Sequence, residues 1–172
     1  MDALVVYESM FGNTQKIAEA VAEGLATRMR TEVTEVDSAP AHVGQEIALL
    51  VVGGPTHAFS MSRTSTRQSA AQQAAGPLVS RGKGVREWLA TLSTSSAALG
   101  WAVFDTRVAK PRLPGSAARA VARRLRRLGV RSVAPVQSFY VTGTQGPLAE
   151  GELDRARRWG ESLAASFSVP TP

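Results

Sequence analysis

The strongest chemical signal in the sequence is a turn of six residues that follows the first apolar run. These residues are Ser9, Met10, Phe11, Gly12, Asn13 and Thr14. Where a strand turns tightly into a helix, backbone N–H groups stay unpaired at the positive end of the helix dipole, so they can hold a phosphate without a basic side chain. The patterns G-x-G-x-x-G and G-x-x-x-x-G-K of nucleotide-binding folds are both absent. The turn therefore predicts binding of one terminal phosphate, with an ordinary capped helix as the alternative.

Two further loops carry residue types that suit a flat ligand. Residues 53–59 read Gly-Gly-Pro-Thr-His-Ala-Phe, and residues 104–107 read Phe-Asp-Thr-Arg. Glycines let a backbone approach a ring closely, and aromatic faces stack on it. His57 is the candidate catalytic proton donor, because imidazole has a pKa of about 6.5. The candidate binding residues in these loops are Gly54, Pro55, Thr56, His57, Ala58, Phe59, Phe104, Asp105, Thr106 and Arg107.

Two of these candidates have equally good structural interpretations. Asp105 at the end of a strand suits a turn or a helix cap as well as it suits a ligand, and Arg107 suits a solvated loop. The sequence alone leaves both alternatives open.

The elements that must position these loops alternate along the chain. Short apolar runs are separated by stretches of helical periodicity, which is the pattern of a parallel sheet covered on both faces. The predicted strands are residues 3–7, 31–36, 47–53, 100–105 and 131–141, and the predicted helices are residues 17–25, 85–92, 118–128 and 153–167. We therefore predict an α/β fold, a three-layer doubly wound sheet of five parallel strands in the order 2-1-3-4-5. In this order the three loops meet at the carboxyl edge of the sheet, where such folds bind ligands.

In these loops the sequence resembles the flavodoxin-like family. Residues 9–14 are similar to the phosphate loop of that family, and residues 53–59 resemble the loop that packs against the isoalloxazine ring in flavodoxin-like quinone reductases. The resemblance covers residues 3–167 and implies a flavoprotein that binds FMN noncovalently. The function it implies is electron transfer or NAD(P)H-dependent reduction of quinone-like acceptors, with a redox partner protein or a small quinone-like molecule as acceptor. It leaves open whether the chain is an enzyme, an FMN-dependent oxidoreductase.

The sequence departs from the family pattern in three respects. Phe11 stands where many flavodoxins have a second Ser or Thr, and neither ring loop contains the tryptophan or tyrosine that commonly sandwiches the ring. The chain is also basic, with 20 Lys and Arg residues against 14 Asp and Glu residues and a net charge of +6, whereas carrier flavodoxins are usually acidic. The role of a generic acidic flavodoxin therefore does not follow from the resemblance.

Composition excludes several classes of protein. A chain of 172 residues suits one domain, which we expect to span residues 1–172. It contains no cysteine and two histidines, so we expect no disulfide and no metal site. No apolar run approaches the ~20 residues that cross a bilayer, and the N-terminus does not read as a signal peptide. We therefore expect a cytoplasmic protein without a membrane span.

Two stretches have an unusual composition. Residues 60–84 are rich in Ser, Thr, Gln, Ala and Arg, so they form either a mobile insertion or a short helix over residues 64–75 that covers the carboxyl edge as a lid. One predicted helix carries the arginines Arg119, Arg123, Arg124, Arg126 and Arg127. A solvated helix face is one interpretation of these arginines, and the alternative function is a flavin-free binding module that docks an acidic partner through them. No nucleic-acid-binding motif accompanies this helix, so we expect no specific nucleic-acid site.

Overall fold

The main sheet of the computed structural model, which describes residues 2–111 and 114–167, is parallel throughout. Its strands are β1 (Asp2–Tyr7), β2 (Arg30–Glu35), β4 (Ile47–Pro55), β6 (Gly100–Val108), β7 (Arg131–Ser132) and β8 (Gln137–Val141). They follow the order β2-β1-β4-β6-β7, and β8 also pairs with β6. The α/β fold and the strand order predicted from the sequence are confirmed.

Two details of the sheet differ from the prediction. The predicted fifth strand is divided into β7 and β8, both of which pair with β6. Pro135 lies between them and has no backbone N–H to donate to the ladder, which accounts for the interruption. A second, small parallel sheet of β3 (His42–Val43) and β5 (Ser93–Thr94) was not predicted, because runs of two residues carry no periodicity.

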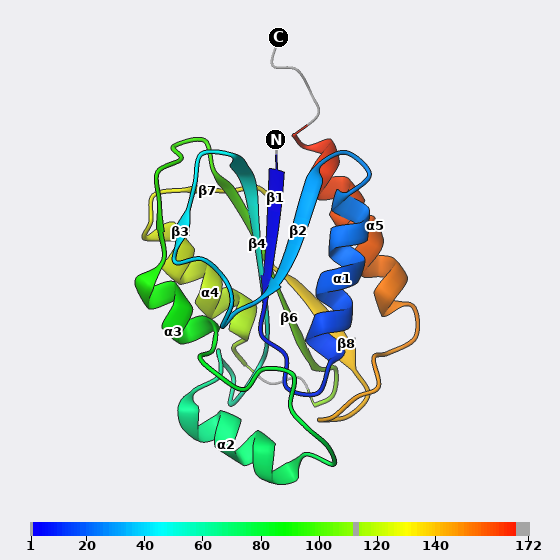
Figure 1. Ribbon diagram of the computed structural model, residues 1–172. Helices are drawn as coiled ribbons and strands as arrows, with labels where there is room; N and C mark the ends of the chain where they lie inside the picture. The colour runs from blue at the N-terminus through cyan, green and yellow to red at the C-terminus, as the bar shows by residue number, and fades with distance from the viewer. Residues whose placement is uncertain (1, 112–113, 168–172) are drawn as a thin grey trace.

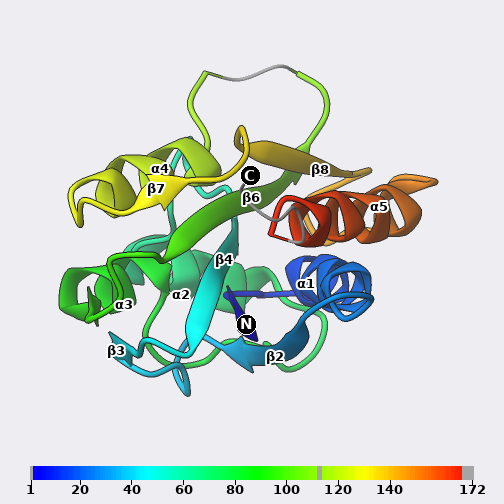
Figure 2. The ribbon, with the colours of Figure 1, turned by 90° about the horizontal axis from the view of Figure 1, so that it is seen from above.

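Helices cover both faces of the sheet (Figures 1 and 2). They are α1 (Asn13–Leu25), α2 (Thr64–Gln73), α3 (Val85–Thr91), α4 (Ala117–Arg126) and α5 (Glu152–Ala165). Figure 2, which looks along the sheet, shows α1 and α5 on one face and α3 and α4 on the other. No helix within the described residues is long and apolar enough to cross a membrane.

The central strands are apolar along their whole length because each face of the sheet has its own core. Leu50 and Val52 belong to the cluster under α3 and α4, whereas Leu49 and Val51 belong to the cluster under α1 and α5. Side chains of a strand alternate between faces, so burial on both faces requires a continuous apolar run. Strand β2 at the edge has exposed and half-buried positions instead, in agreement with its mixed sequence.

Helix α2 lies apart from the two helical layers. Figure 1 shows it below the carboxyl edge of the sheet, at the opposite end of the molecule from the start of β1. Its ten residues form a helix within the segment 60–84, slightly shorter than the predicted alternative of residues 64–75. The carboxyl edge therefore faces a helix that belongs to neither layer.

Candidate functional site

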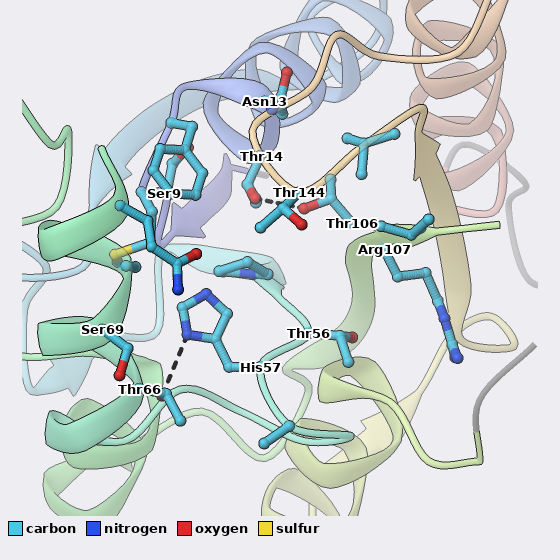
Figure 3. Close-up of a pocket in the computed structure, with 18 residues that line it drawn as sticks. Ser9, Asn13, Thr14, Thr56, His57, Thr66, Ser69, Thr106, Arg107 and Thr144 are labelled. Carbon is cyan, nitrogen blue, oxygen red and sulfur yellow. Dashed lines mark hydrogen bonds between the residues drawn. The ribbon is translucent and has the colours of Figure 1, made fainter. Parts of the chain in front are cut away.

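A pocket with a volume of about 310 Å³ opens at the carboxyl edge of the sheet, between the strand ends and α2 (Figure 3). This volume lies within the range of small-molecule sites. All three predicted loops contribute to its wall. The predicted site residues that line it are Ser9, Met10, Phe11, Asn13, Thr14, Pro55, Thr56, His57, Ala58, Thr106 and Arg107.

The first wall of the pocket is the turn between β1 and α1. Gly12 is the N-cap of α1 and has φ 91°, a left-handed conformation that glycine adopts without strain. No side chain of the described residues caps this helix, so its first N–H groups remain available to a ligand. The Ser9 hydroxyl accepts a hydrogen bond from the Gly12 N–H at 3.1 Å and thereby holds the turn closed. This is the local geometry that the sequence predicted for a phosphate loop.

Two buried hydroxyls meet beside this turn. Thr14 Oγ1 and Thr106 Oγ1 lie 2.7 Å apart, and both side chains are almost fully buried. They join this turn, residues 9–14, to the end of β6, and both face the pocket (Figure 3). We call residues 9–14 the phosphate-type turn. The pair offers hydroxyl donors next to the open helix terminus.

The same turn is fastened from outside by the chain that returns from α2. The N–H groups of Val79 and Ser80 donate to the carbonyls of Met10 and Ser9 at 3.0 and 2.7 Å. The Ser80 hydroxyl accepts from the Ser9 N–H and donates to a carboxylate oxygen of Glu35. The segment around α2 is therefore bonded to the first wall of the pocket by backbone and side chain.

Glu8 is a buried carboxylate directly before this turn, and the sequence analysis did not identify it. Its side chain is 1% exposed and accepts hydrogen bonds from the Ser62 hydroxyl and, at 2.8 Å, from the Val85 N–H. Arg67 donates to the Ser62 hydroxyl and forms an ion pair with Glu87. Burial raises the pKa of the Glu8 carboxyl above its ordinary value, although the Ser62 and Val85 hydrogen bonds lower it. One carboxylate thus ties β1 to the start of α3 and to the chain leading into α2.

The second wall is a hairpin turn with an unusual backbone. His57 and Ser60 exchange backbone hydrogen bonds of 2.8 and 3.0 Å, so Ala58 and Phe59 form a two-residue loop. Ala58 has φ 44° and Phe59 has φ 68°, the left-handed conformation that type I′ turns require at both positions. Asn-Gly pairs usually fill these positions, because side chains with a Cβ atom cost about 1–2 kcal/mol there. The turn stores strain at the edge of the pocket.

His57 is held neutral in this wall. Burial and, to a lesser extent, the positive charge of Arg67 lower the pKa of its imidazole below the ordinary value. Its Nδ1 lies 3.2 Å from Thr66 Oγ1, whose own proton goes to the Arg63 carbonyl. This pattern assigns the proton to Nδ1 and leaves Nε2 as an acceptor. The role of His57 as a proton donor to a ligand stays a prediction.

Five predicted site residues lie outside the pocket lining, so their contact with a ligand stays a prediction. Phe104 is fully buried, and its ring fills the space above Gly53 and packs edge-on against Phe139 and Trp159. Asp105 caps α4 by accepting from the Ala118 N–H and from the Thr56 hydroxyl, each at 3.0 Å. The other three are Gly12, Gly54 and Phe59.

A third wall of the pocket includes α2, the helix that the sequence offered as a lid, although none of the residues of this wall was predicted as a site residue. It consists of α2 residues together with side chains at the ends of β6 and β8, namely Thr66, Ser69, Ala70, Gln73, Val108, Val141 and Thr144. Gln145 donates to the Gln73 carbonyl at 2.6 Å, and Asn13 donates to the Gln145 carbonyl at 3.1 Å. The end of α2 is thus connected across the pocket to the phosphate-type turn. The helix has a weak apolar stripe, so nothing in its sequence indicated which face points inward.

Comparisons with known proteins agree with this geometry. The family model described as flavodoxin matches residues 5–67, which include the first wall and the strained turn. A flavodoxin from the domain Archaea is 19% identical, with a TM-score of 0.66, and the match covers 98% of this chain and 100% of that one. Oxidised flavodoxin 2 from Bacillus cereus is 18% identical, with a TM-score of 0.69, covering 97% and 100%.

A larger protein contains the same fold as one of its parts. The flavodiiron core from Synechocystis is 17% identical, with a TM-score of 0.63, and the match covers 97% of this chain but 36% of that one. None of the curated proteins compared with the chain matches it. The arrangement of strands and helices is that of the flavodoxin-like fold. Residues 5–67 match the family model described as flavodoxin.

Proposed function

We propose that the chain binds FMN noncovalently in the carboxyl-edge pocket and transfers electrons. The observation that carries this proposal is the open N-terminus of α1 beside the buried hydroxyls of Thr14 and Thr106. None of the described residues that line the pocket is a carboxylate, and Arg107 lies at its edge (Figure 3). Such a lining favours an anion, and one helix terminus suits one phosphate group.

The remaining lining residues fit the rest of FMN. Ser9, Asn13 and Thr14 would hold its phosphate, while Pro55 and His57 belong to the wall that would lie against its ring. The ring wall is short in polar groups and offers flat or small side chains, as a planar heterocycle requires. The match of residues 5–67 to the flavodoxin family supports the same cofactor.

The chemistry in this proposal is divided between cofactor and chain. FMN, when bound, supplies the electron or hydride transfer. The α1 terminus and the two threonines bind the phosphate end, and α2 excludes water from the pocket. His57, as a neutral imidazole with Nε2 free to accept, holds or receives a proton at the ring wall.

A second candidate function concerns the acceptor. Ser69 and Gln73 of α2 line the pocket opposite the phosphate-type turn, so a small acceptor would meet polar side chains above the ring wall. This favours NAD(P)H-dependent reduction of a quinone-like molecule, in which case the chain is an enzyme. Steady-state reduction of a soluble benzoquinone by NADH or NADPH, with the FMN-loaded protein, tests it.

Titration of the protein with FMN, riboflavin and FAD, followed by quenching of flavin fluorescence, tests the cofactor. Riboflavin lacks the phosphate, and each charge-assisted hydrogen bond contributes about 1.5–3 kcal/mol, so FMN should bind at least tenfold more tightly. Equal affinities for FMN and riboflavin would contradict the phosphate site. A protein that binds none of the three flavins would support the flavin-free binding module instead.

A further inference from the structure

Charge is divided unevenly between the regions of the chain. Residues 47–149 contain 14 Lys and Arg residues and only two acidic residues, whereas the rest of the chain contains six basic and 12 acidic residues. Of the two acidic residues, Asp105 is fully buried and Glu87 is paired with Arg67. The region that builds α2, α3, α4 and the second and third walls of the pocket is therefore strongly positive.

The arginines of this region gather on the face covered by α3 and α4. Arg119 and Arg123 are exposed on α4, and Arg63 is exposed just before α2. Arg86 of α3 bonds to the carbonyls of Ser62 and Met61 at 3.1 and 2.9 Å. We call Arg63, Arg86, Arg119 and Arg123 the basic face.

No carboxylate of the described part of the chain forms an ion pair with any residue of the basic face. The other side of the molecule differs, because Arg155, Arg157 and Arg158 of α5 all pair with nearby acidic side chains. Burial, and then the positive charges of Arg63 and of Arg124 on α4, lower the pKa of the Arg86 guanidinium. Crowded like charges oppose folding, so an acidic partner would relieve a repulsion that the fold itself leaves in place.

The basic face continues into the wall of the pocket. The Ala117 N–H at the start of α4 donates to the Thr56 hydroxyl at 3.0 Å. A Cβ atom built on Gly115, just before α4, would lie 2.5 Å from the Phe59 carbonyl oxygen. Phe59 is 51% exposed at the tip of the strained turn, between the pocket residue Ala58 and Ser60, whose hydroxyl accepts a hydrogen bond from Arg86 at 3.5 Å. An exposed aromatic ring beside an arginine-rich surface has the composition of a protein interface.

We propose that Phe59 and the basic face dock an acidic redox protein, whose redox centre then lies next to the pocket. This inference rests on the proposed redox function, because only a redox partner gains from being held at the ring wall. Arginine guanidinium groups pair with carboxylates in a fixed bidentate geometry, and such pairs steer association in a salt-dependent way. Nucleic acid would also neutralise the arginines, but it makes no use of an exposed aromatic ring at the pocket edge, and no groove-reading motif is present.

Binding of a plant-type [2Fe–2S] ferredoxin of negative net charge, measured by calorimetry with the full-length chain, tests the proposal. The variant R119E/R123E and the control K16E/R28E change the net charge equally, and neither removes an ion pair found among the described residues. We expect the first variant to bind the ferredoxin at least tenfold more weakly and the control to lose less than threefold. Equal losses in both variants, or no loss in either, would overturn the proposal.

Two further binding measurements determine which kind of partner the basic face recognises. F59A keeps the net charge and should weaken ferredoxin binding about tenfold, because interface aromatics carry much of the binding energy; unchanged binding would overturn the placement of the partner at the pocket. Duplex DNA of about 20 base pairs should bind more weakly than the ferredoxin at about 150 mM salt. If the DNA binds more tightly and R119E/R123E abolishes this, the face is a nucleic-acid site and the proposal is wrong.

Flavin affinity of the same variants separates this inference from the proposed function. R119E/R123E should bind FMN as the wild type does, since neither arginine lines the pocket. Normal FMN binding without a specific loss of ferredoxin binding would overturn the docking surface alone. Specific loss of ferredoxin binding in a protein that binds no FMN would keep the surface and overturn the redox function.

Discussion

The two faces of the sheet are covered by helix pairs that meet in different ways. Helices α1 and α5 touch through their backbones: a Cβ atom on Gly24 would lie 2.1 Å from the Arg157 carbonyl oxygen, and one on Gly160 would lie 2.2 Å from the Val21 carbonyl oxygen. Among the described residues, α3 and α4 have no such glycine contact with each other, and Arg63, Arg86, Arg119 and Arg123 form no ion pair with a carboxylate. The start of α4 contacts the second wall of the pocket. The close backbone contact favours stability on the α1 and α5 face, whereas the arginines make the α3 and α4 face the one that we propose for recognition.

The largest expected effect is on stability, from a substitution at the contact between α1 and α5. Gly160→Val should destabilise the protein by about 3 kcal/mol, because side-chain atoms cannot fit against the α1 backbone unless the two helices separate. Urea denaturation followed by circular dichroism measures the change. Gly76→Ala is the control, since nothing lies within 4 Å of its added Cβ atom and the change should stay within about 1 kcal/mol. Similar losses in both variants would show that the close contact is not what stabilises this face.

The next effect concerns the pocket. Thr14→Ala should weaken FMN binding about ten- to hundredfold, because it removes a hydroxyl worth about 1.5–3 kcal/mol to a phosphate. Fluorescence titration measures it, and riboflavin is the internal control, since a ligand without phosphate should lose little. Thr31→Ala on the edge strand should change neither affinity. If Thr14→Ala weakens riboflavin as much as FMN, the hydroxyl supports the wall of the pocket and not the phosphate.

The pH dependence of the free energy of unfolding tests the raised pKa of the Glu8 carboxyl. A carboxyl whose pKa is raised by folding binds its proton more tightly in the folded state, so it stabilises the fold at low pH, and this contribution is lost as pH rises from its ordinary value of 4.5 through the raised pKa. Glu8→Gln removes the titration and keeps the shape, although its amide oxygen can accept only one of the two hydrogen bonds that the Glu8 oxygens accept. This loss does not depend on pH, so it shifts the curve without changing its slope. The free energy of unfolding, measured against pH, should therefore fall less steeply above pH 4.5 in the variant than in the wild type. Parallel curves would contradict the assignment.

The features that the sequence could predict are those that depend on local signals, and the features it could not predict depend on contacts between distant residues. The turn from β1 into α1 and the central strands depend on local signals, namely a glycine that permits a left-handed φ and continuous apolar runs, and the structure confirms both elements. Phosphate binding at the turn stays a prediction. The role of Glu8 depends on Ser62 and Val85, which lie 54 and 77 residues away, so no local pattern could indicate it. Helix α2 faces the pocket through small and polar side chains, which give no periodic signal.

The strained turn at residues 57–60 also could not be predicted from its own sequence. Its sequence Ala58-Phe59 contains neither asparagine nor glycine, so turn chemistry gave no reason to expect a type I′ hairpin. Tertiary contacts, including the approach of Gly115 to the Phe59 backbone, accompany a conformation that local propensity opposes. Such conflicts between local and global preference are characteristic of functional sites.

The smallest expected effect tests this strain directly. Ala58→Gly should stabilise the protein by about 0.5–1 kcal/mol, because relief of about 1–2 kcal/mol at a left-handed φ exceeds the 0.5–1 kcal/mol that glycine's extra freedom in the unfolded chain costs. Ala90→Gly on the exposed side of α3 is the matched control. It should lower the free energy of unfolding by about 0.5–1 kcal/mol, because glycine gains the same freedom in the unfolded chain and no strain is relieved. Urea denaturation of the two variants and the wild type gives the signs. Opposite signs would show that the turn at the edge of the pocket is strained. The α3 and α4 side of the molecule would then contain a destabilising feature that the α1 and α5 face lacks. Losses in both variants would mean that Ala58 is not strained, and the contrast between the two faces would then rest on charge alone.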